Sequence, residues 1–216
     1  MGFLTSLFSK SAPAPTRTLT QPQQLQLGDI FCFGDSFSLP EAMRKQQLQV
    51  TEINTIEFQH THYAQIIGQG SNDKLTYISF PKNPKQLIKC SLQLTRTDVE
   101  ALFDLDTFAD IFEEPGRARL TPITQQHAYA GMLADEYIQQ DYATSGYFHE
   151  TDYRHNQPPQ FSDQAQGREF EYFSLEGDQG LRVIDIFVFE NGDTDIYLSS
   201  LRPANDIVEL WIKGDA

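Results

Sequence analysis

The stretch "LRVIDIFVFENGDTDIYLSSL" at positions 181–201 decides the fold class of this chain. β-Branched and aromatic residues, which are typical of strands, lie on both sides of Asn191 and Gly192. An Asn-Gly pair can take the positive φ angles of a type I′ turn, which reverses the chain tightly. The stretch therefore predicts two antiparallel strands joined by a type I′ turn.

Comparable runs of strand-forming residues occur on both sides of this hairpin. A second hairpin is predicted where the polar turn "GSND" joins 62–69 to 75–80. The segments 63–80 and 183–200 align without gaps, which fits either two similar β halves or two hairpins that look alike for physical reasons. Further strands are predicted at 25–34, 48–59, 88–94, 168–177 and 206–214.

The middle of the chain carries a helical pattern. An apolar stripe runs along 97–112, Thr97 and Glu100 have the spacing of a capping box, and "EEPG" at 113–116 ends the helix. A second helix is predicted over 124–140 from apolar residues at helical spacing. Strands, then helices, then strands predict an α+β fold, with a mostly antiparallel sheet of hairpins and one or two central helices.

The first 24 residues differ in composition from the rest of the chain. Residues 9–25 are rich in Pro, Ser, Thr and Gln, which favours a flexible linker. We therefore expect a flexible segment at 1–24 and a single α+β domain at 25–216. The sequence favours a frayed terminus at residues 3–8, and the alternative is an amphipathic turn whose apolar residues touch a membrane or a partner. No apolar run reaches the roughly 20 residues that a transmembrane helix needs.

Charge narrows the class of partner. The chain has 30 acidic and 16 basic residues, a formal net charge of −14. So negative a molecule repels nucleic-acid phosphates and favours a basic protein surface or a cationic small molecule. The two cysteines, Cys32 and Cys90, form no CxxC motif and predict reduced thiols, hence a cytoplasmic protein.

Motifs for common catalytic and cofactor sites are missing from the sequence. It contains no GxGxxG, Walker A, HExxH, GxSxG or EF-hand pattern. No cofactor is therefore expected, and the sequence favours a non-enzymatic binding protein.

Four histidines supply the alternative, a metal-dependent or general acid–base enzyme. His60 and His62 would share one face of a strand, while His149 and His155 lie in "GYFHETDYRHNQPPQ" at 146–160. Imidazoles bind transition metals and titrate near neutral pH, but a metal site needs three or four ligands that converge. This alternative requires the two histidine pairs to meet in space.

The segment 146–160 also has a structural interpretation. Asn156 to Pro159 is typical of a loop, so a short strand would end there before the next strand begins. Arg154 would then pair with Asp152 or Glu150 in an ordinary ion pair.

Acidic residues recur along the last strands. If they share one sheet face, they form a negative platform for a cationic ligand or a basic protein, and a solvated outer face is the alternative. The candidate binding residues are Glu169, Glu171, Asp185, Asp193 and Asp195.

Several short stretches resemble the YjfK family of uncharacterised bacterial proteins. They are "MGFLTSLF" before a Pro/Ser linker, "LQLGD" at the first strand, and "REFEYFSLEG" followed by "VFENGD" near the end. The likeness covers 25–212 loosely, and 81–165 carries none of it. It implies a cytosolic bacterial protein encoded beside phage-shock-type membrane-stress proteins and glutathionylspermidine-synthase-like enzymes. It assigns no role to any residue.

Composition and resemblance together favour a binding protein linked to a membrane-stress or polyamine system. The enzyme built on the histidines and a structural subunit of a larger assembly remain the alternatives.

Overall fold

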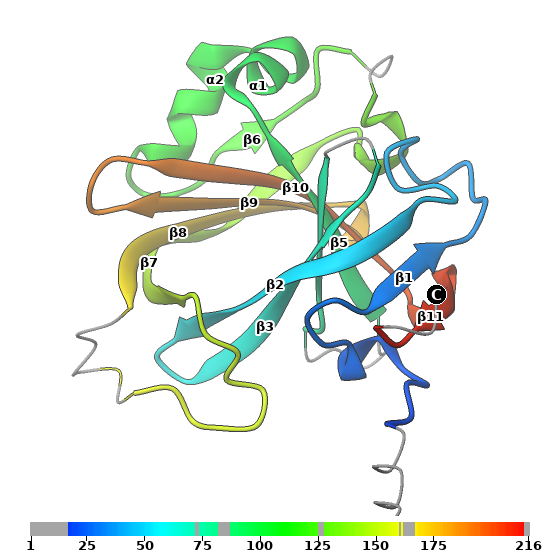
Figure 1. Ribbon diagram of the computed structural model, residues 1–216. Helices are drawn as coiled ribbons and strands as arrows, with labels where there is room; N and C mark the ends of the chain where they lie inside the picture. The colour runs from blue at the N-terminus through cyan, green and yellow to red at the C-terminus, as the bar shows by residue number, and fades with distance from the viewer. Residues whose placement is uncertain are drawn as a thin grey trace, which may run out of the picture.

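The computed structural model describes residues 17–71, 74–81, 87–124, 128–159, 161 and 167–213, and it is built mainly from strands (Figure 1). These residues form one continuous antiparallel sheet. Its strands are β1 (Ile30–Phe33), β2 (Gln47–Phe58), β3 (Thr61–Gln69), β4 (Leu75–Ser79), β5 (Leu87–Leu94), β6 (Arg119–Leu120), β7 (Tyr137–His149), β8 (Arg168–Gly177), β9 (Arg182–Phe189), β10 (Thr194–Pro203) and β11 (Ile207–Trp211).

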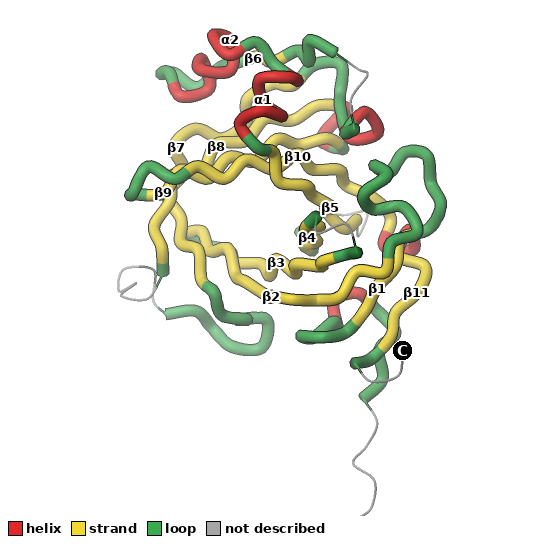
Figure 2. Tube along the Cα trace, turned by 45° about the horizontal axis from the view of Figure 1, so that its top comes forward, coloured by secondary structure: helices red, strands yellow, loops and turns green. Residues whose placement is uncertain are grey.

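The sheet closes on itself as an eight-stranded barrel. The neighbours run β2-β3-β4-β5-β10-β9-β8-β7, and the end of β7 pairs again with β2, from Thr55 opposite His149 to Phe58 opposite Gly146. Figure 2 shows the ring, with β2 and β3 facing β8, β9 and β10. The prediction of an α+β fold is wrong, because the barrel and its added strands make the protein mostly β. Local patterns identify strands but not the pairing of β2 with β7, which are far apart in the chain.

Most strands lie close to where the sequence predicts them, whereas β6 and the first part of β7 lie where no strand is predicted. The segments 63–80 and 183–200 form the hairpins β3–β4 and β9–β10. They do not make two separate halves, because β5 pairs with both β4 and β10 and joins them into one barrel.

The turn between β9 and β10 differs from the predicted type. Gly192 takes a φ of 85°, and its N–H donates to the Phe189 carbonyl at 2.8 Å, whereas Asn191 does not take a positive φ. This is a longer hairpin loop ending in a left-handed glycine, not a type I′ turn. The Asn191 side chain accepts a hydrogen bond from the Asp193 N–H at 3.1 Å, which fixes the loop.

The predicted first helix is two short ones. They are α1 (Arg96–Leu102), capped by Thr95 and not by Thr97, and α2 (Leu105–Ala109), capped by Asp104. Asp104 interrupts the helix because its carboxylate accepts from a backbone N–H and starts a new cap. After a further 3-10 turn, the helical segment ends before "EEPG", as predicted. None of the helices in the described ranges has the length and apolar character needed to cross a bilayer.

The predicted helix at 124–140 is wrong. Within its described part, the chain makes a 3-10 turn at Ala130–Met132 and enters β7 at Tyr137. Tyr137 is fully buried between β6 and β8, and its hydroxyl accepts from the Ala134 N–H at 3.0 Å. Apolar residues at this spacing suit a helix or a strand, and here the pairing with neighbouring strands decides.

The described residues before β1 include part of the segment that the sequence predicts to be flexible. Residues 17–24 contain a 3-10 turn at Pro22–Gln24, and the Arg17 guanidinium pairs with Asp29. Residues 3–8, for which a membrane or partner contact is predicted, lie outside the described residues.

Apolar side chains fill both sides of the barrel wall. On the outside, α1 and α2 cover β8, β9 and β10, on the side away from β2 and β3 (Figure 1). Inside, aromatic rings meet across the barrel: Phe58 of β2 packs on Tyr172 of β8 with ring centres 5.2 Å apart. Eight strands leave an interior that side chains can fill, which this cluster does.

Candidate functional site

The strongest candidate site is a gap along one edge of β2. On that edge β1 pairs with the start of β2, and backbone hydrogen bonds with Gly28 and Asp29 extend this pairing to Val50. β7 takes over at Thr55. The β2 residues 51–54 between them lie beside neither strand, so the sheet forks there. An uncovered strand edge presents main-chain donors and acceptors.

A β-bulge lies at the same place. The register between β2 and β3 shifts between Val50 and Glu52, which makes Thr51 the extra residue. The Thr51 hydroxyl donates to the Ile67 carbonyl at 3.4 Å. Bulges turn side chains to a new direction and are frequent beside functional sites. The bulge therefore sets where the side chains of 51–54 point.

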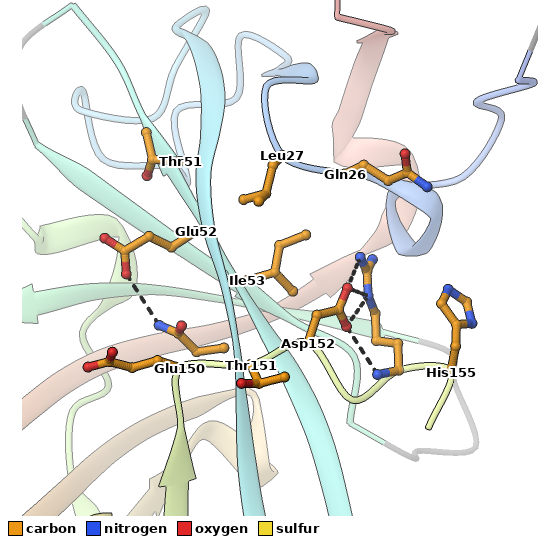
Figure 3. A pocket seen from close by; sticks show the side chains of 11 residues that line it. Gln26, Leu27, Thr51, Glu52, Ile53, Glu150, Thr151, Asp152 and His155 are labelled. Atoms are coloured by element: carbon orange, nitrogen blue, oxygen red, sulfur yellow. Dashed lines mark hydrogen bonds and ion pairs between the residues drawn. The ribbon is translucent and has the colours of Figure 1, made fainter. Parts of the chain in front are cut away.

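A cavity of about 870 Å³ occupies the fork. We call it the fork cavity. It is lined by 51–54 of β2, 26–27 before β1, and 150–152, Arg154 and His155 after β7 (Figure 3). Its volume lies within the range of about 300–1,000 Å³ that is usual for small-molecule sites. The loop after β7 thus forms one wall. β7 ends at His149, earlier than Asn156, where the sequence predicts the loop to begin.

Arg154 holds this wall together. Its Nη2 donates to Asp152 Oδ2 at 2.6 Å, and its Nη1 donates to the Gln23 and Leu25 carbonyls at 2.9 and 2.8 Å. Burial acts to raise the pKa of Asp152, but the hydrogen bonds from Arg154 outweigh it and lower that pKa. The charge of Arg154 is therefore matched by Asp152, and the two clamp the loop to the segment before β1.

The other end of the fork cavity is acidic. Glu52 and Glu150 lie on the opposite side of β2 from Asp152 and His155 in Figure 3. Glu52 accepts a 3.5 Å hydrogen bond from Asn54, and neither glutamate forms an ion pair within the described ranges. The two carboxylates give this end a negative potential without a matching cation.

The negative potential also reaches the barrel interior. Burial raises the pKa of Tyr77 to about 12, and the charges of Asp195 and Glu52 act in the same direction. Glu52 therefore contributes to the electrostatics of the barrel interior as well as to the fork cavity.

The four predicted histidines do not converge. His149 is buried, its Nε2 lies 2.9 Å from Glu57 Oε2, and its ring packs on Tyr153. His62 and His155 both line a separate cavity of about 600 Å³ at the end of the β2–β3 hairpin, and His60 lies in the turn of that hairpin. In the described part of the chain, no three His, Cys, Asp or Glu side chains are placed to hold a metal ion.

The five predicted acidic residues do not share one face. Asp185 is buried inside the barrel, where it accepts hydrogen bonds from Lys89, Tyr172 and Ser199 at 2.5, 2.6 and 2.8 Å. Asp195 is half-buried and accepts from Gln93 at 2.9 Å, and burial raises its pKa.

The remaining three acidic residues are exposed. Glu169 and Glu171 alternate on β8 with the buried Phe170, so they point outward, and Asp193 lies in the β9–β10 turn. Strand alternation separates these residues from Asp185 and Asp195, because neighbouring positions face opposite sides of the barrel wall.

Sequence reasoning missed the β2 side of the fork cavity. The signal is a break in alternation: apolar Leu48 and Val50 are two apart, and the next apolar residue is Ile53, three further on. Such a change of parity marks a bulge. It identifies Thr51 and Glu52 as the site of a bulge, but it does not show that β1 and β7 separate beside them.

Comparison of the chain with protein-family models, curated proteins and solved structures yields no match. The resemblance to the YjfK family therefore stays a prediction, and the function rests on the chemistry of the site.

Proposed function

We propose that this protein is a non-enzymatic binding protein that takes an amine-bearing small molecule into the fork cavity. The observation that carries the proposal is the pair Glu52 and Glu150, two carboxylates at one end of a cavity of ligand size. A concave site favours a small molecule over a flat basic protein surface, the other partner class that the charge of −14 suggests.

The charges of the fork cavity favour a cation. Asp152 is already matched by Arg154, so Glu52 and Glu150 remain to bind a ligand ammonium group. Leu27 and Ile53 line the same cavity, and an alkyl chain can pack against them. A linear polyamine combines these two features.

A binding role fits this geometry better than acid–base catalysis. His149, the best candidate for a base, is 2% exposed and held by Glu57 outside the fork cavity lining. A general base must reach the proton that it removes. Both cysteines are free and buried, which supports a reducing, cytoplasmic location as part of the proposal.

The test is isothermal titration calorimetry with spermidine in about 0.1 M NaCl, where the screening length is about 10 Å. The double variant Glu52→Gln/Glu150→Gln should weaken binding about tenfold or more, because each charge-assisted hydrogen bond contributes strongly. Binding to the unchanged protein should also weaken as NaCl is added.

The matched control is Glu169→Gln/Glu171→Gln. It also removes two negative charges, but from the exposed outer face of β8, so both double variants are less negative than the unchanged protein by the same amount. This control should bind spermidine within about twofold of the unchanged protein, because long-range charge is screened at moderate salt. Equal weakening by both variants, or no binding of spermidine, would refute the proposal.

A further inference from the structure

A second cavity, of about 540 Å³, lies on another part of the molecule. We call it the arginine cavity. Phe37, Arg44 and Gln46 line it from the connection between β1 and β2, and Ser71 and Tyr129 are among the residues opposite. The fork cavity shares none of these residues.

Within the described ranges, the Arg44 side chain takes part in no ion pair. Its Nε is buried and makes no hydrogen bond in the part of the chain that the structure describes. The guanidinium carbon instead lies over the Phe37 ring, 5.3 Å from the ring centre. A buried N–H without an acceptor costs free energy, so this position favours an acceptor from outside the chain.

Other arginines of this acidic protein pair with carboxylates. Arg44, Arg117 and Arg168 form no ion pair among the described residues, and of these three only Arg44 has a buried Nε without a hydrogen bond. The arginines that pair with a carboxylate include Arg17, Arg96, Arg119, Arg154 and Arg202.

The walls of the arginine cavity are held in place by the fold. The Arg44 N–H donates to the Pro40 carbonyl at 3.2 Å, and Arg44 forms a backbone bridge with Phe33. Gly131 touches Ser38 so closely that a Cβ there would lie 2.8 Å from the Ser38 carbonyl oxygen. The Arg202 guanidinium donates to Ser38 from the opposite side. Arg44 is therefore presented on a braced segment.

The lining indicates the class of ligand. A guanidinium is planar and binds the two oxygens of a carboxylate or phosphate side by side. Lys74 adds a positive charge to the lining, and Glu41 is the carboxylate on it. Phe37 is 89% exposed and offers a ring face to a flat apolar group.

We infer that the arginine cavity binds an oxyanion carried by a flat apolar group, with Arg44 as the anion ligand and Phe37 as the stacking surface. The site is independent of the fork cavity, and its charge preference is the opposite. The protein would thus hold a cation in one cavity and an organic anion in the other.

The experiment measures the affinity of the protein for phenyl phosphate and for inorganic phosphate by two-dimensional amide NMR titration. Arg44→Gln should weaken the binding of phenyl phosphate at least about tenfold, because the two parallel hydrogen bonds from the guanidinium to the phosphate are lost. Arg119→Gln is the matched control. It removes one positive charge from an exposed ion pair with Glu136, and binding should stay within about twofold.

A second variant tests the stacking surface. Phe37→Ala should reduce the affinity for phenyl phosphate to that for inorganic phosphate, and leave inorganic phosphate itself unchanged. Phe37 is exposed, so this variant retains the fold. If Arg44→Gln unfolds at a lower temperature than the unchanged protein, Arg44→Lys replaces it in the test. This variant keeps the positive charge but loses the planar guanidinium, so it should also weaken the binding of phenyl phosphate.

Three results would overturn the inference. The first is that phenyl phosphate does not bind at millimolar concentration. The second is that Arg44→Gln and the unchanged protein bind phenyl phosphate with equal affinity. The third is that Arg119→Gln loses as much affinity for phenyl phosphate as Arg44→Gln does.

Discussion

At the scale of single residues, Asp185 shows how the barrel accepts a charge in its interior. Lys89, Tyr172 and Ser199 all donate to its carboxylate, so both oxygens are satisfied. Burial raises the pKa of Tyr172, and the nearby Asp185 charge adds to this, so the phenol stays protonated and donates. A buried ion pair is tolerated when its hydrogen bonds are complete. This explains an aspartate in the middle of the apolar strand β9.

The two thiols provide a prediction at the same scale. Burial raises the pKa of Cys90 to about 12, and burial together with the Glu209 charge raises that of Cys32. The thiolate is the reactive form, so neither thiol should react with Ellman's reagent in the folded protein near about pH 8. In urea, where both pKa values return to the ordinary range, both thiols should react.

The absorbance of the released thionitrobenzoate checks this. Fast labelling of the folded protein would show that a thiol is accessible and would contradict the buried placement of Cys32 and Cys90.

At the scale of elements, β7 makes the closure of the barrel possible. It pairs with β6 at its start, with β8 along its length and with β2 at its end. Two register shifts interrupt its pairing with β8, and Ala143 takes a φ of 47° within the second, between Asp141 and Thr144. Such irregularities bend a strand and increase its twist. The bend carries the end of β7 onto β2 and also leaves the gap that becomes the fork cavity.

The variant Gly146→Ala tests this seam. A Cβ at Gly146 would lie 2.5 Å from the Phe170 ring and 2.7 Å from the Glu57 carbonyl oxygen. The strands must separate to admit it, so the free energy of unfolding should fall by about 1–3 kcal/mol. Urea denaturation measures the change.

Ser145→Ala is the control, because Ser145 is the exposed neighbour on the same strand. It should change the free energy of unfolding by less than about 0.5 kcal/mol. Equal effects of the two substitutions would show that the seam is not closely packed at Gly146.

Elements also differ in how well the sequence predicts them. The strand around Val183 to Phe189 is found because its β-branched and aromatic residues admit no other regular structure. The segment at Met132 to Tyr137 is misassigned, because its spacing suits a helix and only β6 and β8 decide otherwise. The predicted cap at Thr97 is two residues late, since Thr95 and Asp98 satisfy each other's backbone N–H groups just as well.

At the scale of the whole molecule, the net charge of −14 sets the response to salt. Like charges in a compact protein repel one another, which destabilises the folded state. Raising NaCl from about 0.01 M to about 0.15 M shortens the screening length from about 30 Å to about 8 Å. The melting temperature should therefore rise by a few degrees. For a chain of this size, each kcal/mol added to the free energy of unfolding raises the melting temperature by roughly 2–4 °C.

Calorimetry in NaCl checks this prediction, with the protein free of spermidine. A fall in melting temperature would mean that surface ion pairs such as Arg119–Glu136 stabilise the fold more than net repulsion destabilises it. NaCl is expected to raise the melting temperature but to weaken spermidine binding, so the two effects of salt can be told apart.

The sequence by itself determined most of the strands and the net charge of −14, whereas the start of β7 is predicted as a helix and the class of partner stays a prediction. Strand preference and net charge are properties of neighbouring residues and of composition, so no fold is needed to find them. Only the tertiary structure decided that Asp185 faces inward, that His149 meets Glu57 and not His60, and that Glu52 and Glu150 share a cavity. These depend on the pairing of β2 with β7, and long-range pairing is set by closure of the whole sheet and not by any local pattern.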